Sequence, residues 1–167
     1  MSLTVIETNR LLLREFNTSD AEGFFNLNND PEVLKYTGDQ PFESLAGAEK
    51  FLSDYNQYSL YGYGRWTVLH KHTNEYLGWC GLKYSPGNDE TDIGFRFLRS
   101  CWNKGYATEA AKATVDFGFK KLNLKLIVGR AMKDNIASVK VLEKAGLTYW
   151  KDFDFDGHNG VYFKIEK

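Results

Sequence analysis

The sequence predicts a mixed α/β fold in a single domain. Strand-like segments dominate the first half of the chain and alternate with helical patterns in the second half, which is typical of helices packed on a mixed sheet. The chain has 167 residues, of which 43% are hydrophobic and 16% aromatic, enough for one sizeable core. Because no internal repeat, low-complexity tract or linker interrupts it, we assign residues 1–167 to one domain.

The first half of the chain contains three strand patterns and two helical ones. An apolar run at Leu11 to Leu13 indicates a first strand, the next helix ends before the Asp30-Pro31 break, and Ser44 is a plausible N-cap for the following one. Two further strands flank a polar turn at Lys71 to Asn74. The expected elements are a strand from Leu3 to Phe16, helices from Asp20 to Asn28 and from Ser44 to Tyr58, and strands from Arg65 to His70 and from Tyr76 to Tyr84.

The second half alternates strands and helices. A turn at Ser85 to Asp89 precedes a strand, a small-residue stripe from Ala107 to Gly118 indicates a helix packed closely on a sheet, and Gly146 is a plausible C′ residue of a second helix. The expected elements are strands from Asp92 to Leu98 and from Lys125 to Met132, helices from about Ala107 to Leu122 and from Asn135 to Lys144, and a hairpin from Leu147 to Phe155 and from Val161 to Glu166.

The segment from Trp102 to Ala110 is the most informative part of the chain. It joins a predicted strand to a predicted helix and contains Gly105 and Ala107. A tight turn at such a junction leaves backbone N–H groups unpaired next to the positive end of the helix dipole, and both features favour a phosphate-bearing ligand. A tight strand-to-helix turn without any ligand explains the same residues.

Three segments of the second half resemble the GNAT superfamily of acyl-CoA-dependent N-acyltransferases, and most closely the branch that contains the ribosomal-protein N-terminal acetyltransferases. They are Asp92-Ile93-Gly94-Phe95-Arg96-Phe97-Leu98, Trp102-Asn103-Lys104-Gly105-Tyr106-Ala107-Thr108-Glu109-Ala110, and Asn135-Ile136-Ala137-Ser138 followed by Leu142-Glu143-Lys144-Ala145-Gly146-Leu147. The opening Glu7-Thr8-Asn9-Arg10-Leu11-Leu12-Leu13-Arg14 and the later Asp30-Pro31-Glu32-Val33 are also similar to this branch.

The resemblance implies a GNAT-like, mostly antiparallel central sheet of about seven strands, splayed in the middle and flanked by about four helices. It implies acetyl-CoA as co-substrate, with backbone groups near Phe97 and Leu98 pairing with the pantetheine arm. The amides of Asn103, Lys104, Gly105, Tyr106, Ala107 and Thr108 would hold the diphosphate, Lys104 would add charge, and Asn135 would bond the pantetheine amide. As an alternative or additional role, Asn135 is an N-cap.

Two residues are candidates for the chemistry. Asp92 occupies the position where relatives often carry a strand glutamate, and a partly desolvated carboxylate has a pKa raised toward that of a useful base. The alternative is that Asp92 merely ends a strand after Asp89-Glu90, and a primary amine can also arrive neutral. Ser138 resembles the serine that orients or protonates the leaving thiolate in some members, although a helix-start hydrogen bond explains it equally well.

Two positions depart from the superfamily pattern. Trp102 stands where Gln or Arg is frequent, a change that is common in this branch. Leu142 stands where many relatives have the tyrosine that protonates the thiolate, so a general acid must come from elsewhere. This departure keeps open a different class of function, a CoA-binding sensor or interaction module without turnover.

An alternating acidic segment is a candidate for substrate attraction. Asp152, Asp154 and Asp156 alternate with Phe153 and Phe155, so the carboxylates share one strand face. They would form an acidic lip for a cationic amine, or simply a solvated strand face, which is the commoner pattern.

Charge and composition limit the partners and the location. The net charge of −1 argues against a nucleic-acid binder. Residues 99–144 hold ten Lys/Arg and four Asp/Glu, against eleven and eighteen in the remainder, which suits an anionic co-substrate as well as ordinary surface charge. No membrane segment or secretory signal is visible, and two cysteines form no disulfide framework, so we expect a cytoplasmic protein.

The expected function is transfer of an acetyl group from acetyl-CoA to a primary amine by direct attack in a ternary complex. The acceptor is either a protein N-terminus or a small-molecule amine. Nothing marks Cys101 as an activated nucleophile, and His70, His72 and His158 lack the spacing of a metal site, so we expect no covalent enzyme intermediate and no metal. A homodimer is expected from the resemblance.

Overall fold

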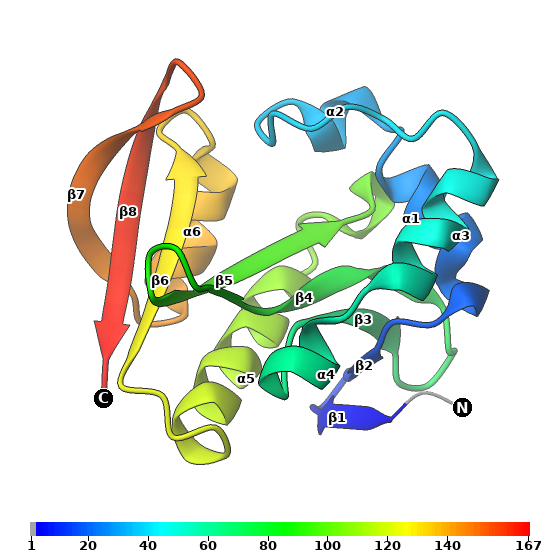
Figure 1. Ribbon diagram of the computed structural model, residues 1–167, viewed down its shortest axis with the longest axis horizontal. Helices are drawn as coiled ribbons and strands as arrows, with labels where there is room; N and C mark the ends of the chain where they lie inside the picture. The colour runs from blue at the N-terminus through cyan, green and yellow to red at the C-terminus, as the bar shows by residue number, and fades with distance from the viewer. Residues whose placement is uncertain (1–2) are drawn as a thin grey trace.

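The computed structural model describes residues 3–167, which form one eight-stranded sheet in the order β1-β2-β3-β4-β5-β6-β8-β7 (Figure 1). All neighbouring strands are antiparallel except β5 and β6, which are parallel. The strands are β1 (Thr4–Glu7), β2 (Leu11–Glu15), β3 (Arg65–His70), β4 (Tyr76–Ser85), β5 (Glu90–Phe97), β6 (Leu126–Met132), β7 (Thr148–Phe155) and β8 (His158–Glu166). The predicted mixed, mostly antiparallel sheet is confirmed.

The sheet has one strand more than predicted because the segment from Leu3 to Phe16 is a hairpin and not a single strand. β1 and β2 pair antiparallel, and the amide of Thr8 donates to the carbonyl of Leu11 over 2.9 Å to close the turn. The turn contains neither glycine nor proline, and a single asparagine, Asn9, is a weak signal for a turn.

The helices differ from the prediction in the first half of the chain. They are α1 (Ala21–Leu27), α2 (Pro31–Leu34), α3 (Leu45–Asp54), α4 (Gln57–Tyr61), α5 (Tyr106–Lys120) and α6 (Ile136–Lys144). The predicted helix from Ser44 to Tyr58 is two helices. Ser44 caps α3 as expected, but α3 ends at Tyr55, whose backbone is extended. The hydroxyl of Tyr55 accepts a hydrogen bond from the amide of Arg65. The short α2 was not predicted.

Two layers cover opposite faces of the sheet. Cys80 and Leu82 of β4 belong to the core shared with α5, whereas the neighbouring Trp79 packs against the cluster of α1 and α3. The predicted small-residue stripe of α5 is buried from Ala110 to Gly118, and a Cβ added at Gly118 would lie 2.8 Å from Ile127. This close packing holds α5 against the middle of the sheet.

The centre of the sheet splays, as expected. β5 and β6 are paired only at Asp92 with Val128 and at Ile93 with Gly129. Beyond these pairs β5 continues along β4 while β6 continues along β8, so the two strands diverge (Figure 1). We call the space between the diverging ends the wedge. Within residues 3–167, no helix is long and apolar enough to cross a membrane.

Candidate active site

The loop before α5 has the geometry of an anion cradle. Asn103 and Gly105 both have left-handed backbone, with φ of 62° and 81°, and α5 begins at Tyr106 without a side-chain cap. Alternating conformations of this kind turn successive N–H groups toward one side, where the helix dipole adds positive potential. The indole N–H of Trp102 donates to the carbonyl of Phe97 over 2.9 Å and fixes the loop to the end of β5. We call the segment from Trp102 to Gly105 the phosphate loop.

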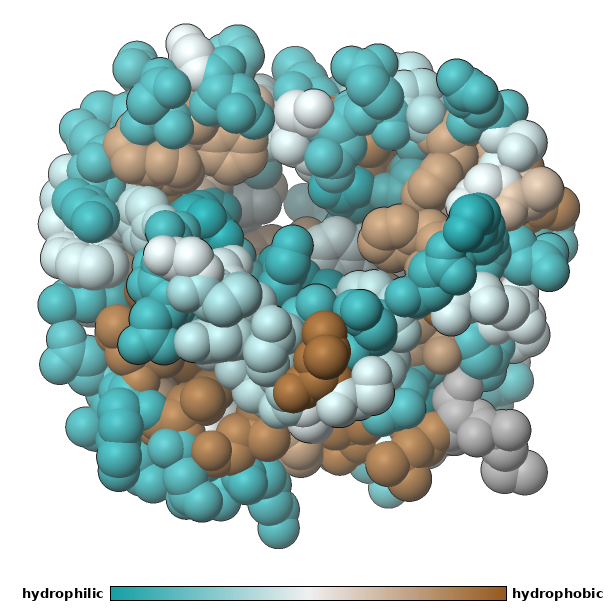
Figure 2. Space-filling view, viewed as in Figure 1, coloured by the Kyte–Doolittle hydropathy of each residue, from teal (hydrophilic) through white to brown (hydrophobic). Residues whose placement is uncertain are grey.

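The wedge and the start of α5 open into one cavity of about 1300 Å³. Viewed from the front, the molecule is hollowed between the part that carries β6 to β8 and the part that carries α2 (Figure 2). Of the residues expected in the site, those that line the cavity are Asp92, Phe97, Asn103, Gly105, Tyr106, Ala107, Thr108, Asn135 and Ser138. Leu98 and Lys104 do not line it. One cavity therefore joins the expected diphosphate residues to the expected catalytic ones.

The backbone of β5 offers hydrogen bonds to the wedge at alternate residues. The amide of Leu98 donates to the carbonyl of Leu77 over 2.9 Å, so Leu98 points its backbone toward β4. In an antiparallel ladder the neighbouring residues point the other way. Phe95 and Phe97 therefore direct their backbone groups toward the wedge, whereas the amide of Leu98 is bonded to β4.

Asp92 is buried at the point of the wedge between two arginines. Its carboxylate forms ion pairs with Arg65 of β3, at 2.9 Å, and with Arg130 of β6. Burial by itself would raise the pKa of Asp92, but the charges of Arg65 and Arg130 outweigh it and lower the pKa. The raised pKa expected from the sequence is thus wrong in direction, and the carboxylate is a weak base.

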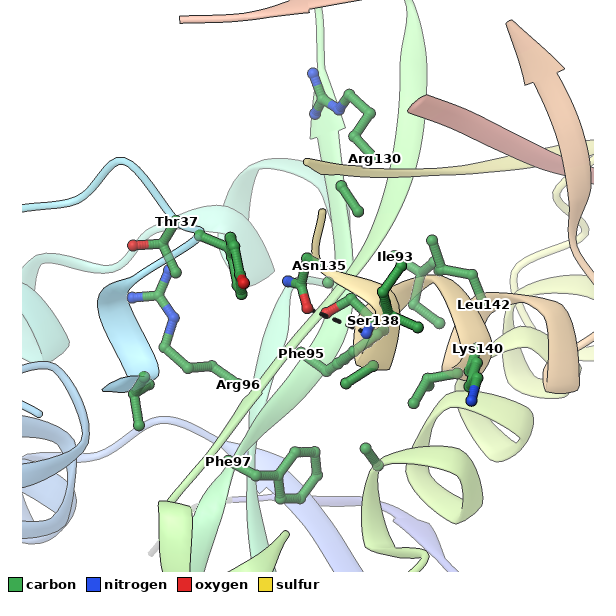
Figure 3. A pocket seen from close by; sticks show the side chains of 18 of the residues that line it. Thr37, Ile93, Phe95, Arg96, Phe97, Arg130, Asn135, Ser138, Lys140 and Leu142 are labelled. Carbon is green, nitrogen blue, oxygen red and sulfur yellow. Dashed lines mark hydrogen bonds between the residues drawn. The ribbon is translucent and has the colours of Figure 1, made fainter. Parts of the chain in front are cut away.

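The start of α6 forms a second wall of the cavity. Asn135 caps the helix, because its side-chain oxygen accepts the amide of Ser138 over 3.3 Å (Figure 3). This bond uses the backbone amide of Ser138 and not its hydroxyl, and Ser138 lines the cavity. The side chain of Leu142 is buried below, where a Cβ on Gly129 would approach it to 2.6 Å. The exposed Lys140 also lines the cavity.

The opposite wall comes from the segment after α2 and from Arg96 of β5. Arg96 donates to Asn28 over 2.6 Å and to Asp39 over 2.8 Å, and Thr37 lies beside it (Figure 3). A Cβ on Gly38 would lie 3.4 Å from the carboxylate of Asp156, so this segment nearly touches the β7–β8 turn.

Asp154 and Asp156 line the cavity, whereas Asp152 does not. The acidic lip predicted from three carboxylates is thus reduced to two at the cavity.

Sequence reasoning missed the arginines. Arg65, Arg96 and Arg130 all line the cavity, although they lie on three different strands. Arg130 did carry a local signal, since it is the one charged residue in the otherwise apolar run from Leu126 to Met132.

Burial raises the pKa of the Cys101 thiol, which agrees with the expectation of a passive cysteine. Among residues 3–167 no cluster of three or more His, Cys, Asp or Glu could hold a metal.

A family profile described as "acetyltransferase (GNAT) domain" matches residues 10–148. The chain belongs to the GNAT acetyltransferases. The match includes β5, the phosphate loop, α5 and α6, and so covers the walls of the wedge. The resemblance to the GNAT superfamily is confirmed, and the chain is an acetyl-CoA-dependent N-acetyltransferase.

Named relatives agree with this assignment. The chain is 34% identical over 142 residues to an uncharacterized N-acetyltransferase p20 of Bacillus licheniformis, covering 84% of this chain and 80% of that protein. It is 30% identical over 158 residues to FsC-acetyl coenzyme A-N(2)-transacetylase of Aspergillus fumigatus, covering 89% of this chain and 66% of that protein. The crystal structure of a GNAT-family acetyltransferase from Bacillus anthracis is similar with a TM-score of 0.84 and 27% identity, over 99% of this chain and 98% of that one.

Proposed function

We propose that this GNAT enzyme transfers the acetyl group of acetyl-CoA to a primary amine by direct attack in a ternary complex. The observation that carries the proposal is the single cavity lined both by the start of α5 and by Asp92 and Ser138. One space can therefore receive the diphosphate of the donor and the amine of the acceptor together, which direct transfer requires. Acetyl-CoA supplies the activated acetyl thioester.

The residues of the phosphate loop fit a diphosphate. Gly105 has a left-handed φ that L side chains rarely adopt, and the first turn of α5 has no side-chain cap. Asn103, Tyr106, Ala107 and Thr108 complete this wall. The backbone N–H of Phe97, which faces the wedge, and Asn135, which lines the same cavity, would hold the pantetheine arm in extended form.

Asp92 is a positioning residue for two arginines and not a strong base. Its Oδ1 lies 2.9 Å from Nη2 of Arg65 but takes part in no well-aligned hydrogen bond within residues 3–167. This oxygen is buried and has no exposed surface to meet an amine. Asp92 would instead hold in place Arg65 and Arg130, which both line the cavity. Because the pKa of Asp92 is lowered, the amine must lose its proton to solvent before it attacks.

Ser138 is our candidate for donating a hydrogen bond to the departing thiolate. It lies in the first turn of α6, where its hydroxyl lines the cavity and the helix dipole favours negative charge. Because Leu142 is buried and carries no hydroxyl, it cannot donate a hydrogen bond to the thiolate.

The acceptor is a protein N-terminus or a small-molecule amine that binds at the end of the cavity lined by Thr37, Asp154 and Asp156. The acidic groups at this end, Asp154 and Asp156, would attract its positive charge before it deprotonates. A cytoplasmic location and a homodimer remain predictions.

The buried Leu142 favours one second candidate, a CoA-binding sensor of the same fold without turnover. The two are separated by incubating the protein with acetyl-CoA and a panel of amines that includes peptides with free N-termini, a polyamine, an aminoglycoside and amino acids. Release of free CoA with acetylation of one class supports transfer. Saturable CoA binding without turnover on any class would support the sensor.

A further inference from the structure

Arg10, on the turn between β1 and β2, contacts the phosphate loop from behind. Its Nη1 donates to the carbonyl of Lys104 over 2.9 Å, and its guanidinium lies 4.4 Å from the centre of the Tyr106 ring. A Cβ added at Gly105 would lie 3.3 Å from its Nη2. One side chain, more than 90 residues away in sequence, thus contacts the residues on both sides of Gly105, where the phosphate loop meets α5.

The same arginine binds the acidic residue of the first turn of α5. Its Nε donates to Oε1 of Glu109 over 2.7 Å, and its backbone amide donates to Oε2 over 2.9 Å. The hydroxyl of Thr8 also donates to Oε2, over 2.6 Å. Both carboxylate oxygens are therefore held by the β1–β2 turn.

Glu109 is ionised at neutral pH. Partial burial would raise its pKa, but the hydrogen bonds from Thr8 and Arg10 and the charge of Arg10 lower it. An ionised carboxylate in the first turn stabilises a helix, yet it also repels an anion bound at the same helix end. Glu109 therefore works against the proposed diphosphate site unless its charge is compensated.

We propose that Arg10 is a positioning residue for the diphosphate of the co-substrate. Arg10 neutralises Glu109 and fixes the phosphate loop through the Lys104 carbonyl. The inference rests on the proposed function, because it assumes that the loop binds a diphosphate. Arg10 does not line the cavity, so it acts through the loop and the helix and not by touching the ligand.

The test compares CoA with pantetheine, which lacks the diphosphate and the adenosine. We expect Arg10→Ala to weaken CoA binding about tenfold, the effect of one lost charged contact, and to change pantetheine binding less than about twofold. A merely structural role would weaken both ligands alike, since both need the folded wedge. Calorimetry gives both dissociation constants, and circular dichroism confirms that the variant is folded.

Two more variants separate the parts of the inference. Glu109→Gln removes the repelling charge, so it should bind CoA at least as tightly as the unmodified protein. The double variant Arg10→Ala with Glu109→Gln should recover part of the CoA affinity lost in Arg10→Ala. Lys120→Gln, which removes an exposed positive charge at the far end of α5, is the matched control and should leave CoA affinity unchanged.

The outcomes are distinct. A CoA affinity that Arg10→Ala leaves unchanged, an equal loss for CoA and pantetheine, or a double variant no better than Arg10→Ala would each overturn the inference while CoA binding by the unmodified protein stands. If the unmodified, folded protein does not bind CoA, the proposed function fails, and the inference fails with it.

Discussion

Asp92 of β5 and Arg130 of β6 form an ion pair at the point where the two parallel strands separate. Arg65 of β3 binds the other carboxylate oxygen, so three strands meet at one buried carboxylate. The two ion pairs hold the strands together at the point of the wedge, and its open end remains free for ligands.

The first prediction concerns stability. Asp92→Asn removes the buried carboxylate that pairs with Arg65 and Arg130 and, within residues 3–167, leaves Arg130 only Glu90 as a counter-charge, at 3.9 Å. We expect it to lower the free energy of unfolding at pH 7 by about 3 to 5 kcal/mol. The folded-state pKa of Asp92 is below its ordinary value of 3.8, so the stabilisation is present above that value and is lost as the pH falls through the folded-state pKa. Urea unfolding of both proteins at pH 7 and near pH 3 should show the difference shrinking at the lower pH. A difference that grows on acidification would contradict the lowered pKa.

The second prediction concerns the pH dependence of turnover. With Asp92 ionised throughout, the rise of kcat/KM with pH should follow the deprotonation of the acceptor amine. Two acceptors whose amines differ in pKa should give rate profiles displaced by that difference, and Asp92→Asn should keep the displacement. If kcat/KM instead rises with the same apparent pKa for both acceptors, and this rise disappears in Asp92→Asn, then Asp92 is the base.

The third prediction concerns the glycine of the phosphate loop. Gly105 and Gly62 have nearly the same left-handed φ, 81° and 83°, but Gly62 lies at the end of α4, away from the cavity. Alanine at either position should cost about 1 kcal/mol of stability through backbone strain. Only Gly105→Ala should also weaken CoA binding, as measured by calorimetry. Equal CoA affinities in the two variants would remove the loop from the site.

The fourth prediction concerns Ser138. Ser138→Ala removes the hydroxyl but keeps the amide bond to Asn135, so α6 should form normally. We expect kcat to fall at least about tenfold, with little change in the affinity for CoA, if the hydroxyl assists departure of the thiolate. Ser59→Ala, on the exposed surface of α4, serves as the control. A kcat within twofold of the unmodified protein would leave Ser138 with a capping role only.

The parts of the site that lie close together in sequence were predicted, because local patterns report them. The turn at Gly105, the small-residue stripe of α5 and the cap at Asn135 each depend on neighbouring residues. The wedge itself was expected only from the resemblance, since no periodicity shows where two paired strands separate.

The electrostatics of the site could not be predicted in the same way. Arg65 and Arg130 are 27 and 38 residues from Asp92 in sequence, and only the strand order brings them to one carboxylate. Burial alone suggests a raised pKa, and the two arginines reverse the direction. The hairpin turn that places Arg10 behind the phosphate loop was missed for a related reason, since it carries no glycine or proline.

The most direct test of the central claim is a calorimetric titration of the folded protein with acetyl-CoA, with ATP as the control anion. The account predicts saturable binding of acetyl-CoA and no comparable binding of ATP, because the wedge holds the pantetheine arm as well as the diphosphate. A folded protein that does not bind acetyl-CoA, or that binds ATP equally well, would contradict the assignment of the cavity.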